Sequence, residues 1–304
     1  MTTTSYARPM RARARRWRAG AGLLALVLAV AGCNLDLDLT DPNSPTENTA
    51  LSSVEGVVAT SLGMQDQFAI SVNAYVRAPA LVTDEWGPTS RALAADLALF
   101  SGEGIDPTFG TVSGPYYSTF RVVRTAEAII ANVPRLQGIG GGLAAGLTAN
   151  ARLFKAMALG MAAQQYERLP ITASSAGAPL LPRAEVFTEV IRLLEAARTD
   201  LAGVTDAELA GFRNSAVSPG FDLRNTIDAM LARYYLFTGQ YQAAIDAAAR
   251  VDLTVVSVLT YPDPAVNPIH DYSVIAGYVA PLQSFVNEAE PGDQRVPFWV
   301  NVSG

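Results

Sequence analysis

Apolar residues that recur every three or four positions constrain this 304-residue chain more than any other feature. The pattern appears in five stretches, which are bounded by glycine, proline or a helix-capping residue. Such spacing places one apolar face on an α-helix, and alanine-rich, glycine-punctuated sequence favours closely packed helices. We therefore predict a mainly α-helical protein. The predicted helices cover residues 44–68, 116–133, 149–168, 182–201 and 225–250.

The boundaries of these helices follow from capping residues and prolines. Ser44 is a predicted N-cap, Pro45 suits the first helical position, and Glu47 is placed to complete a capping box. Pro134 closes the second helix, and Pro170 disfavours helical geometry at the residue before it. Short connections then join consecutive helices into pairs.

The stretch 225–250 reads as a helical hairpin that is broken at Gly239-Gln240. Its large, small and aromatic residues fall where tetratricopeptide repeats place theirs. These residues are Leu231, Ala232, Tyr235, Gly239, Tyr241, Ala244 and Ala248. One repeat cannot bury its apolar face alone, so the two earlier helix pairs strengthen the interpretation.

Three stretches lack helical periodicity. Five glycines crowd residues 137–148, but no Gly-Lys-Ser/Thr motif or strand accompanies them, so we expect a flexible connection rather than a phosphate site. Residues 253–259 are rich in β-branched side chains and predict a strand. Irregular, proline-rich and aromatic sequence follows to Gly304, where we expect the chain to be truncated.

Residues 78–115 form a further long aperiodic stretch, and a loop of this length is usually functional or disordered. Its Asp84, Glu85, Trp86 and Arg91 are the candidate ligand-binding residues. An aromatic face can stack on a sugar ring while charged side chains bind hydroxyl groups. The alternative for each is structural, with Trp86 as a buried anchor and Arg91 as a solvated charge.

The first 32 residues have the features of a secretory signal. Six arginines and no acidic residue precede an apolar run of about ten residues, far short of the roughly twenty that a membrane-spanning helix needs. The run ends in Val30-Ala31-Gly32-Cys33, which resembles the lipobox of bacterial lipoproteins. This resemblance implies that Cys33 is acylated and becomes the new amino terminus. The alternative is an ordinary signal peptide with a stray thiol, and Arg15-Arg16 leaves the export route open.

Charge and composition exclude several classes of function. The signal holds six of the 22 basic residues and none of the 28 acidic ones, so the mature part has a formal net charge of −12. That charge argues against nucleic acid as a partner. Cys33 is the only cysteine and His270 the only histidine, so we expect no metal site and no cofactor. His270 and the adjacent Asp271 are unsuited to orient one another as a catalytic pair, and we expect no enzyme activity.

Several motifs follow one another along the chain: Cys33, residues 39–46, the helix from Arg152 with its ending at Tyr166 to Ile171, Pro182-Arg183, and Asp293-x-Arg295. Taken in this order, they resemble the SusD/RagB-like lipoproteins, although Glu167-Arg168 departs from the usual Gly-Asp of a Tyr-Gly-Asp-x-Pro-like motif. The resemblance implies tetratricopeptide-like hairpins with an irregular, loop-rich ligand-binding subdomain. It also implies an outer-membrane, lipid-anchored protein at the cell surface that binds an oligosaccharide or peptide. A SusC-like TonB-dependent transporter would then receive the ligand.

The resemblance divides the chain into a signal peptide (1–32), an acylated tether (33–48), a helical region (49–252) and the start of an irregular subdomain (253–304). A second hypothesis fits the helices and anchor equally well. In it, the protein is an envelope scaffold that binds another protein and no small molecule, which leaves the aromatic segment 261–299 without a purpose.

Overall fold

The computed structural model describes residues 47–174, 177–261 and 264–299, and these belong to one compact unit. The protein is mainly α-helical, as predicted. The signal, Cys33 and the predicted cap at Ser44-Pro45 lie outside the described residues. In chain order, the elements are α2 (Glu47–Ala50), α3 (Val54–Val82), β1 (Trp86–Pro88), α4 (Ala94–Ser101), α5 (Gly110–Asn132), η1 (Val133–Arg135), α6 (Gly141–Gln165), β2 (Arg168–Leu169), β3 (Leu181–Pro182), α7 (Arg183–Asp200), α8 (Ala210–Ser215), α9 (Leu223–Phe237), α10 (Tyr241–Ala248), α11 (Pro268–His270), η2 (Asp271–Ile275), β4 (Val279–Pro281), α12 (Ser284–Asn287) and α13 (Arg295–Trp299).

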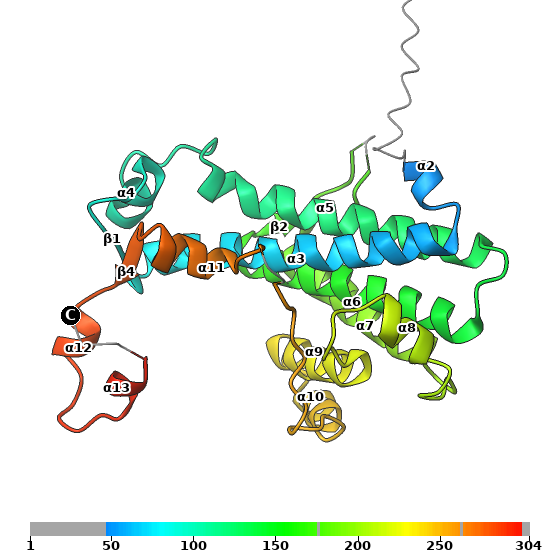
Figure 1. Ribbon diagram of the computed structural model, residues 1–304. Helices are drawn as coiled ribbons and strands as arrows, with labels where there is room; N and C mark the ends of the chain where they lie inside the picture. The colour runs from blue at the N-terminus through cyan, green and yellow to red at the C-terminus, as the bar shows by residue number, and fades with distance from the viewer. Residues whose placement is uncertain (1–46, 175–176, 262–263, 300–304) are drawn as a thin grey trace, which may run out of the picture. The chain divides into compact units, whose positions relative to one another are not determined.

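Helix α6 is the centre of the packing. It contacts α3, α5, α7 and α9, and most of its residues are buried (Figure 1). Phe154 lies in the core between an edge-on contact with Phe68 and a tilted contact with Phe221. We call α3, α5, α6, α7 and α9 the helical body, because their buried side chains form one large hydrophobic cluster.

The first helix differs from its prediction. α2 is a single turn, and α3 begins at Val54, where Ser53 caps it by accepting a hydrogen bond from the backbone of Gly56 at 3.0 Å. α3 also continues past the predicted end at Phe68 to Val82, with Pro79 inside it. Proline lacks the N–H that would bond the carbonyl four residues earlier. The Tyr75 carbonyl accepts instead from Gln165 Nε2 at 2.7 Å, a tertiary contact that no local pattern reveals.

Only part of the glycine cluster is a connection: Gly138 and Gly140 lie between η1 and α6, whereas α6 begins at Gly141 and continues through Gly142 and Gly146. A Cβ atom on Gly142 would lie 2.1 Å from the Glu208 carbonyl oxygen, and one on Gly146 would lie 2.4 Å from Cγ of Phe212. Glycine therefore permits the close approach of α6 to the 208–212 segment. Tertiary packing outweighs the low helix propensity of glycine here.

The other helices largely confirm the prediction. α5 ends directly before the turn that contains Pro134, and α7 spans almost the predicted range. α9 and α10 form the predicted hairpin, with Gly239 at φ +73° in the turn, a conformation that glycine adopts without strain. The predicted strand at 253–259 is wrong. The segment pairs with no strand, and its Ser257 hydroxyl contacts the backbone of Asp222 instead.

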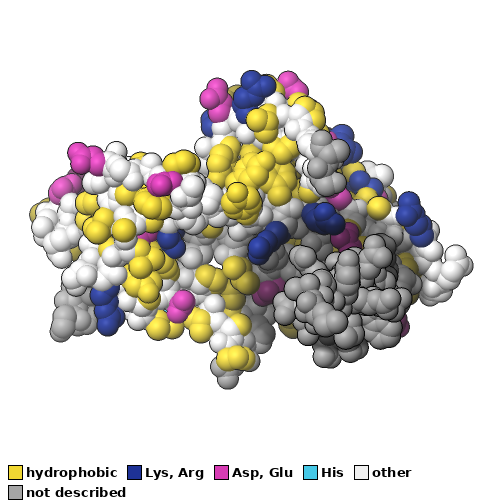
Figure 2. Space-filling model, turned by 90° about the horizontal axis from the view of Figure 1, so that it is seen from above, with side chains coloured by type: hydrophobic (Ala, Val, Ile, Leu, Met, Phe, Trp, Pro, Cys, Tyr) yellow, Lys and Arg dark blue, Asp and Glu magenta, His cyan; other side chains and the backbone are white. Residues whose placement is uncertain are grey.

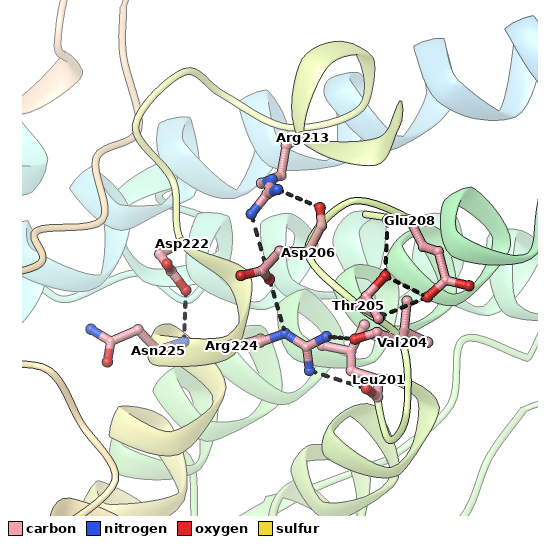
Figure 3. A network of polar contacts seen from close by, with 9 residues as sticks. All are labelled: Leu201, Val204, Thr205, Asp206, Glu208, Arg213, Asp222, Arg224 and Asn225. Atoms are coloured by element: carbon pink, nitrogen blue, oxygen red, sulfur yellow. Dashed lines mark hydrogen bonds and ion pairs between the residues drawn. The ribbon is translucent and has the colours of Figure 1, made fainter. Parts of the chain in front are cut away.

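Two arginines secure the connection between α7 and α9 (Figure 3). Arg224 donates a hydrogen bond to the carbonyl of Leu201 at 3.0 Å and another to the carbonyl of Val204. Asp206 lies between Arg213 and Arg224, with ion-pair distances of 3.6 and 3.9 Å. A cation suits the exposed carbonyls at a helix C-terminus, so this network ends α7 and orients α9.

Candidate ligand-binding site

A short two-stranded ribbon joins residues that are almost two hundred positions apart. β1 and β4 pair antiparallel, with Trp86 opposite Pro281, Gly87 opposite Ala280 and Pro88 opposite Val279. The Thr89 hydroxyl extends the join by donating to the Gly277 carbonyl at 2.6 Å. The stretch 78–115 is therefore not the long loop predicted, since it contains the end of α3, β1, α4 and the start of α5.

A buried ion pair joins α3 to α4, the two helices that contact β1. Arg77 of α3 lies 3.2 Å from Asp96 of α4 (Nε to Oδ1), and the Asp96 side chain is fully buried. Tyr272 of η2 donates its hydroxyl to Asp96, and the Arg77 guanidinium lies over the Tyr272 ring at 4.1 Å. Burial is the main cause that raises the Tyr272 pKa, followed by the hydrogen bond to Asp96.

A small apolar cluster completes this support. Leu81, Leu99, Tyr272 and Val279 pack together, with Trp86 and Tyr278 at its edge. We call β1, α4, η2 and β4 the ribbon region. Figure 1 shows these elements at one end of α3, separate from the hairpin α9–α10. The ribbon region thus has its own small core in addition to the buried ion pair.

An open hollow of about 870 Å³ lies beside the ribbon. Trp86 and Phe285 supply aromatic surface, and the Phe285 side chain is half exposed. The hollow is lined by Glu85, Trp86, Pro281, Ser284, Phe285, Glu288, Ala289, Asp293, Arg295 and Val296. It thus combines two aromatic side chains with several charged groups, the mixture typical of sites that bind sugars or peptides.

One ion pair lies within the lining of the hollow. Arg295 donates four hydrogen bonds to Asp293, one from its backbone N–H and three from its guanidinium, and the shortest joins Nη2 to Oδ2 at 2.6 Å. The side-chain hydrogen bond from Arg295 is the main cause that lowers the pKa of Asp293 to about 2. The pair therefore keeps its charges through the physiological pH range. Glu85 and Glu288 add two further carboxylates to the lining.

Of the four candidate ligand-binding residues, two line the hollow and two lie outside its lining. Glu85 and Trp86 line the hollow. Asp84 does not, and it sits in the turn after α3 at φ +61°, a left-handed conformation that aspartate tolerates better than most residues. Arg91 does not line the hollow either, because its Nη1 donates to the Ala276 carbonyl at 3.2 Å. Arg91 holds the turn before β4.

Sequence reasoning did not single out Phe285 or Glu288 as site residues. Both lie in the segment 261–299, whose aromatic and irregular character was the available signal. Asp293 and Arg295 were noted only as a family-like motif, and the structure places them in the lining. No periodicity relates these residues to Trp86, so only the folded chain brings them together.

Other features of the described residues are weaker candidates for a functional site. A second hollow of about 680 Å³ is lined mainly by glycine and small apolar residues near the start of α6, with Glu208 as its charged side chain. His270 is exposed, and neighbouring positions on a helix do not face each other, so Asp271 is not oriented toward it. No group of three or more His, Cys, Asp or Glu residues in the described ranges is arranged to hold a metal ion.

Apolar side chains also gather on part of the surface that is seen from above in Figure 2. The rings of Tyr116, Tyr117, Phe120 and Tyr166 form one contact group, in which Tyr117 is mostly exposed.

Within the described ranges, none of the helices has the length and apolarity required to cross a membrane.

Comparison with known proteins yields little. No known family model matches the sequence, and no curated protein matches it. A solved structure of a "putative sugar binding protein" from Bacteroides vulgatus is similar at 19% identity and a TM-score of 0.49. The match covers 66% of this chain but only 46% of that one, so this chain spans less than half of its length. A match of that strength assigns neither family nor ligand.

Proposed function

We propose that this protein is a nutrient-binding lipoprotein that captures an oligosaccharide in the hollow beside the β1–β4 ribbon. The proposal rests on one observation: Trp86, Phe285 and the Asp293–Arg295 pair all line the same hollow of about 870 Å³. Aromatic faces stack on the apolar faces of sugar rings, and carboxylates and guanidinium groups bind paired hydroxyls. The hollow is large enough for a ligand of a few sugar units.

Location and delivery follow from the sequence resemblance. Cys33 is the proposed acylation site, and several acyl chains would hold the protein at the outer membrane, facing the cell surface. A SusC-like TonB-dependent transporter is the proposed recipient of the ligand. Binding and handover require no bond cleavage, so the proposal assigns no catalytic residue.

The Trp86→Ala variant tests the site. It removes the larger of the two aromatic surfaces in the lining. An aromatic contact contributes about 0.5–1.5 kcal/mol beyond the area that it buries, so we expect about tenfold loss of affinity for any glycan found in a binding screen. Tyr241→Ala is a matched control, because Tyr241 lies in α10, is 66% exposed and does not line the hollow. Equal affinity of the wild-type protein and the Trp86→Ala variant for every bound glycan would remove the hollow from consideration.

The anchor and the partner have separate tests. Cys33→Ser should move the protein from the membrane fraction to the soluble fraction. A pull-down of the native gene product from detergent-solubilised outer membrane should recover a TonB-dependent barrel in equal amount. A lipidated, abundant protein that recovers no barrel would exclude the transporter partnership.

The scaffold hypothesis has one observation in its favour. Large apolar side chains on the α9–α10 hairpin are exposed, among them Leu236, Tyr241 and Ile245 at 54%, 66% and 61%. A protein partner could cover such a face. Recovery of an assembly factor instead of a barrel in the same pull-down would favour this second function.

A further inference from the structure

The charges that line the hollow beside the ribbon are unbalanced. Three carboxylates, from Glu85, Glu288 and Asp293, face one guanidinium, from Arg295. Of the described residues in the lining, only Arg295 is basic, and Asp293 already neutralises it through three hydrogen bonds from the guanidinium. Two carboxylates therefore remain without a basic partner in the lining, one before β1 and the other directly after α12.

Arg91, the basic residue that follows β1, does not correct this charge imbalance. Arg91 donates to the Ala276 carbonyl and lies against Gly277, on the turn that leads into β4. It is not part of the lining. The acidic residues Asp84 and Glu290 are neighbours in sequence of Glu85 and Ala289, which adds to the negative character of this part of the chain.

From this arrangement we infer that the hollow selects cationic sugars, namely oligosaccharides with free amino groups, over neutral and anionic ones. The inference rests on the proposed function, since it specifies the ligand class of the same site. Trp86 and Phe285 would contact the ring faces while Glu85 and Glu288 pair with ring ammonium groups. Uronic-acid or sulfated sugars would meet two unneutralised carboxylates and bind more weakly because of like-charge repulsion.

The expected size of this affinity preference follows from the exposure of the two glutamates. Glu85 and Glu288 are both exposed, so each ion pair with a ligand amine resembles a surface pair in strength. Two such pairs together correspond to a preference of about fivefold to tenfold at low salt. The preference should shrink as salt rises, because exposed charges are screened.

The test uses four probes of equal length: tetra-glucosamine, its N-acetylated form, tetragalacturonate and tetralysine. Calorimetry at low salt should show tetra-glucosamine binding about fivefold to tenfold tighter than the N-acetylated form, and tetragalacturonate binding more weakly than either. The double variant Glu85→Gln/Glu288→Gln should abolish that preference, so that the amino and N-acetylated forms bind it with similar affinity. Glu103→Gln/Glu167→Gln is the control, since both residues are exposed and outside the lining.

The outcomes separate the two proposals. If the N-acetylated or anionic oligomer binds through Trp86 as tightly as tetra-glucosamine does, the charge preference is wrong while the sugar site stands. If no sugar binds at all, the proposed function fails at this site together with the preference. If tetralysine binds as tightly as tetra-glucosamine and Trp86→Ala has no effect on either, the site recognises charge alone and the amino-sugar inference is overturned.

Discussion

The helical body and the ribbon region differ in the size of their apolar cores. In the body, α6 buries a largely apolar surface in one large cluster, and the ion pair between its Lys155 and Glu127 of α5, at 2.8 Å, adds to that cluster. The ribbon region has a cluster of four buried side chains and a buried Arg77–Asp96 pair. Packing tolerates little change in shape, whereas a ribbon of three residue pairs can shift without unfolding the protein. The candidate site adjoins the region with the smaller core.

The largest expected effect comes from the core of the body. Phe154→Ala removes a fully buried ring that contacts Phe68 and Phe221, and should destabilise the protein by roughly 3–5 kcal/mol. Urea unfolding followed by far-ultraviolet circular dichroism measures the change. Loss of only the ribbon region, with the helices intact, would contradict the assignment of Phe154 to a common core.

Asp96→Asn should affect the ribbon region alone. It leaves the Arg77 guanidinium without its charged partner, which lowers the local stability by about 3 kcal/mol, the lower end for a buried pair because Arg77 keeps some exposure. Hydrogen exchange of the β1 and β4 amides should accelerate while that of α6 stays unchanged. Asp200→Asn is the control, since its pair with Arg152 is partly exposed. Equal acceleration in α6 would show that the two regions unfold together.

Alkaline pH tests the burial of Tyr234 in the body. Burial is the main cause that raises its pKa to about 12, above the ordinary value near 10. The unfolded chain loses this proton first, so the free energy of unfolding falls between pH 10 and 12, by about 2–3 kcal/mol from this residue. Tyr234→Phe should show a correspondingly smaller fall in unfolding experiments across this range. An identical fall in both proteins would mean that Tyr234 is more accessible than the packing indicates.

The smallest effect is expected at the end of the ribbon. Thr89→Val removes the hydroxyl that donates to the Gly277 carbonyl, and should destabilise the ribbon region by about 1 kcal/mol. Thr188→Val in α7 is the matched control, because the exposed Thr188 hydroxyl donates to the Ala184 carbonyl within the same helix. Hydrogen exchange at β4 measures the difference between the two. If both variants leave β4 equally protected, the Thr89 contact does not hold the ribbon.

Local sequence determined most of the helices. The three- and four-residue periodicity, Pro134, Pro170 and Gly239-Gln240 act on neighbouring residues, so the end of α5, both ends of α7 and the α9–α10 hairpin match their predictions closely. The start of α5 does not, because the helix begins at Gly110 and not at Tyr116. Their capping and breaking effects are decided within a few positions. The choice of Glu85 and Trp86 as candidates also came from local composition, and both line the hollow.

Tertiary contacts decided the features of the fold and of the hollow that local sequence did not predict. Gly142 and Gly146 belong to a helix because α6 must approach Phe212 closely, and α3 continues through Pro79 because Gln165 satisfies the freed carbonyl of Tyr75. The segment 253–259 has the residues of a strand but no strand beside it to pair with. The hollow itself depends on β1 meeting β4, and such long-range pairing leaves no periodic trace in the sequence.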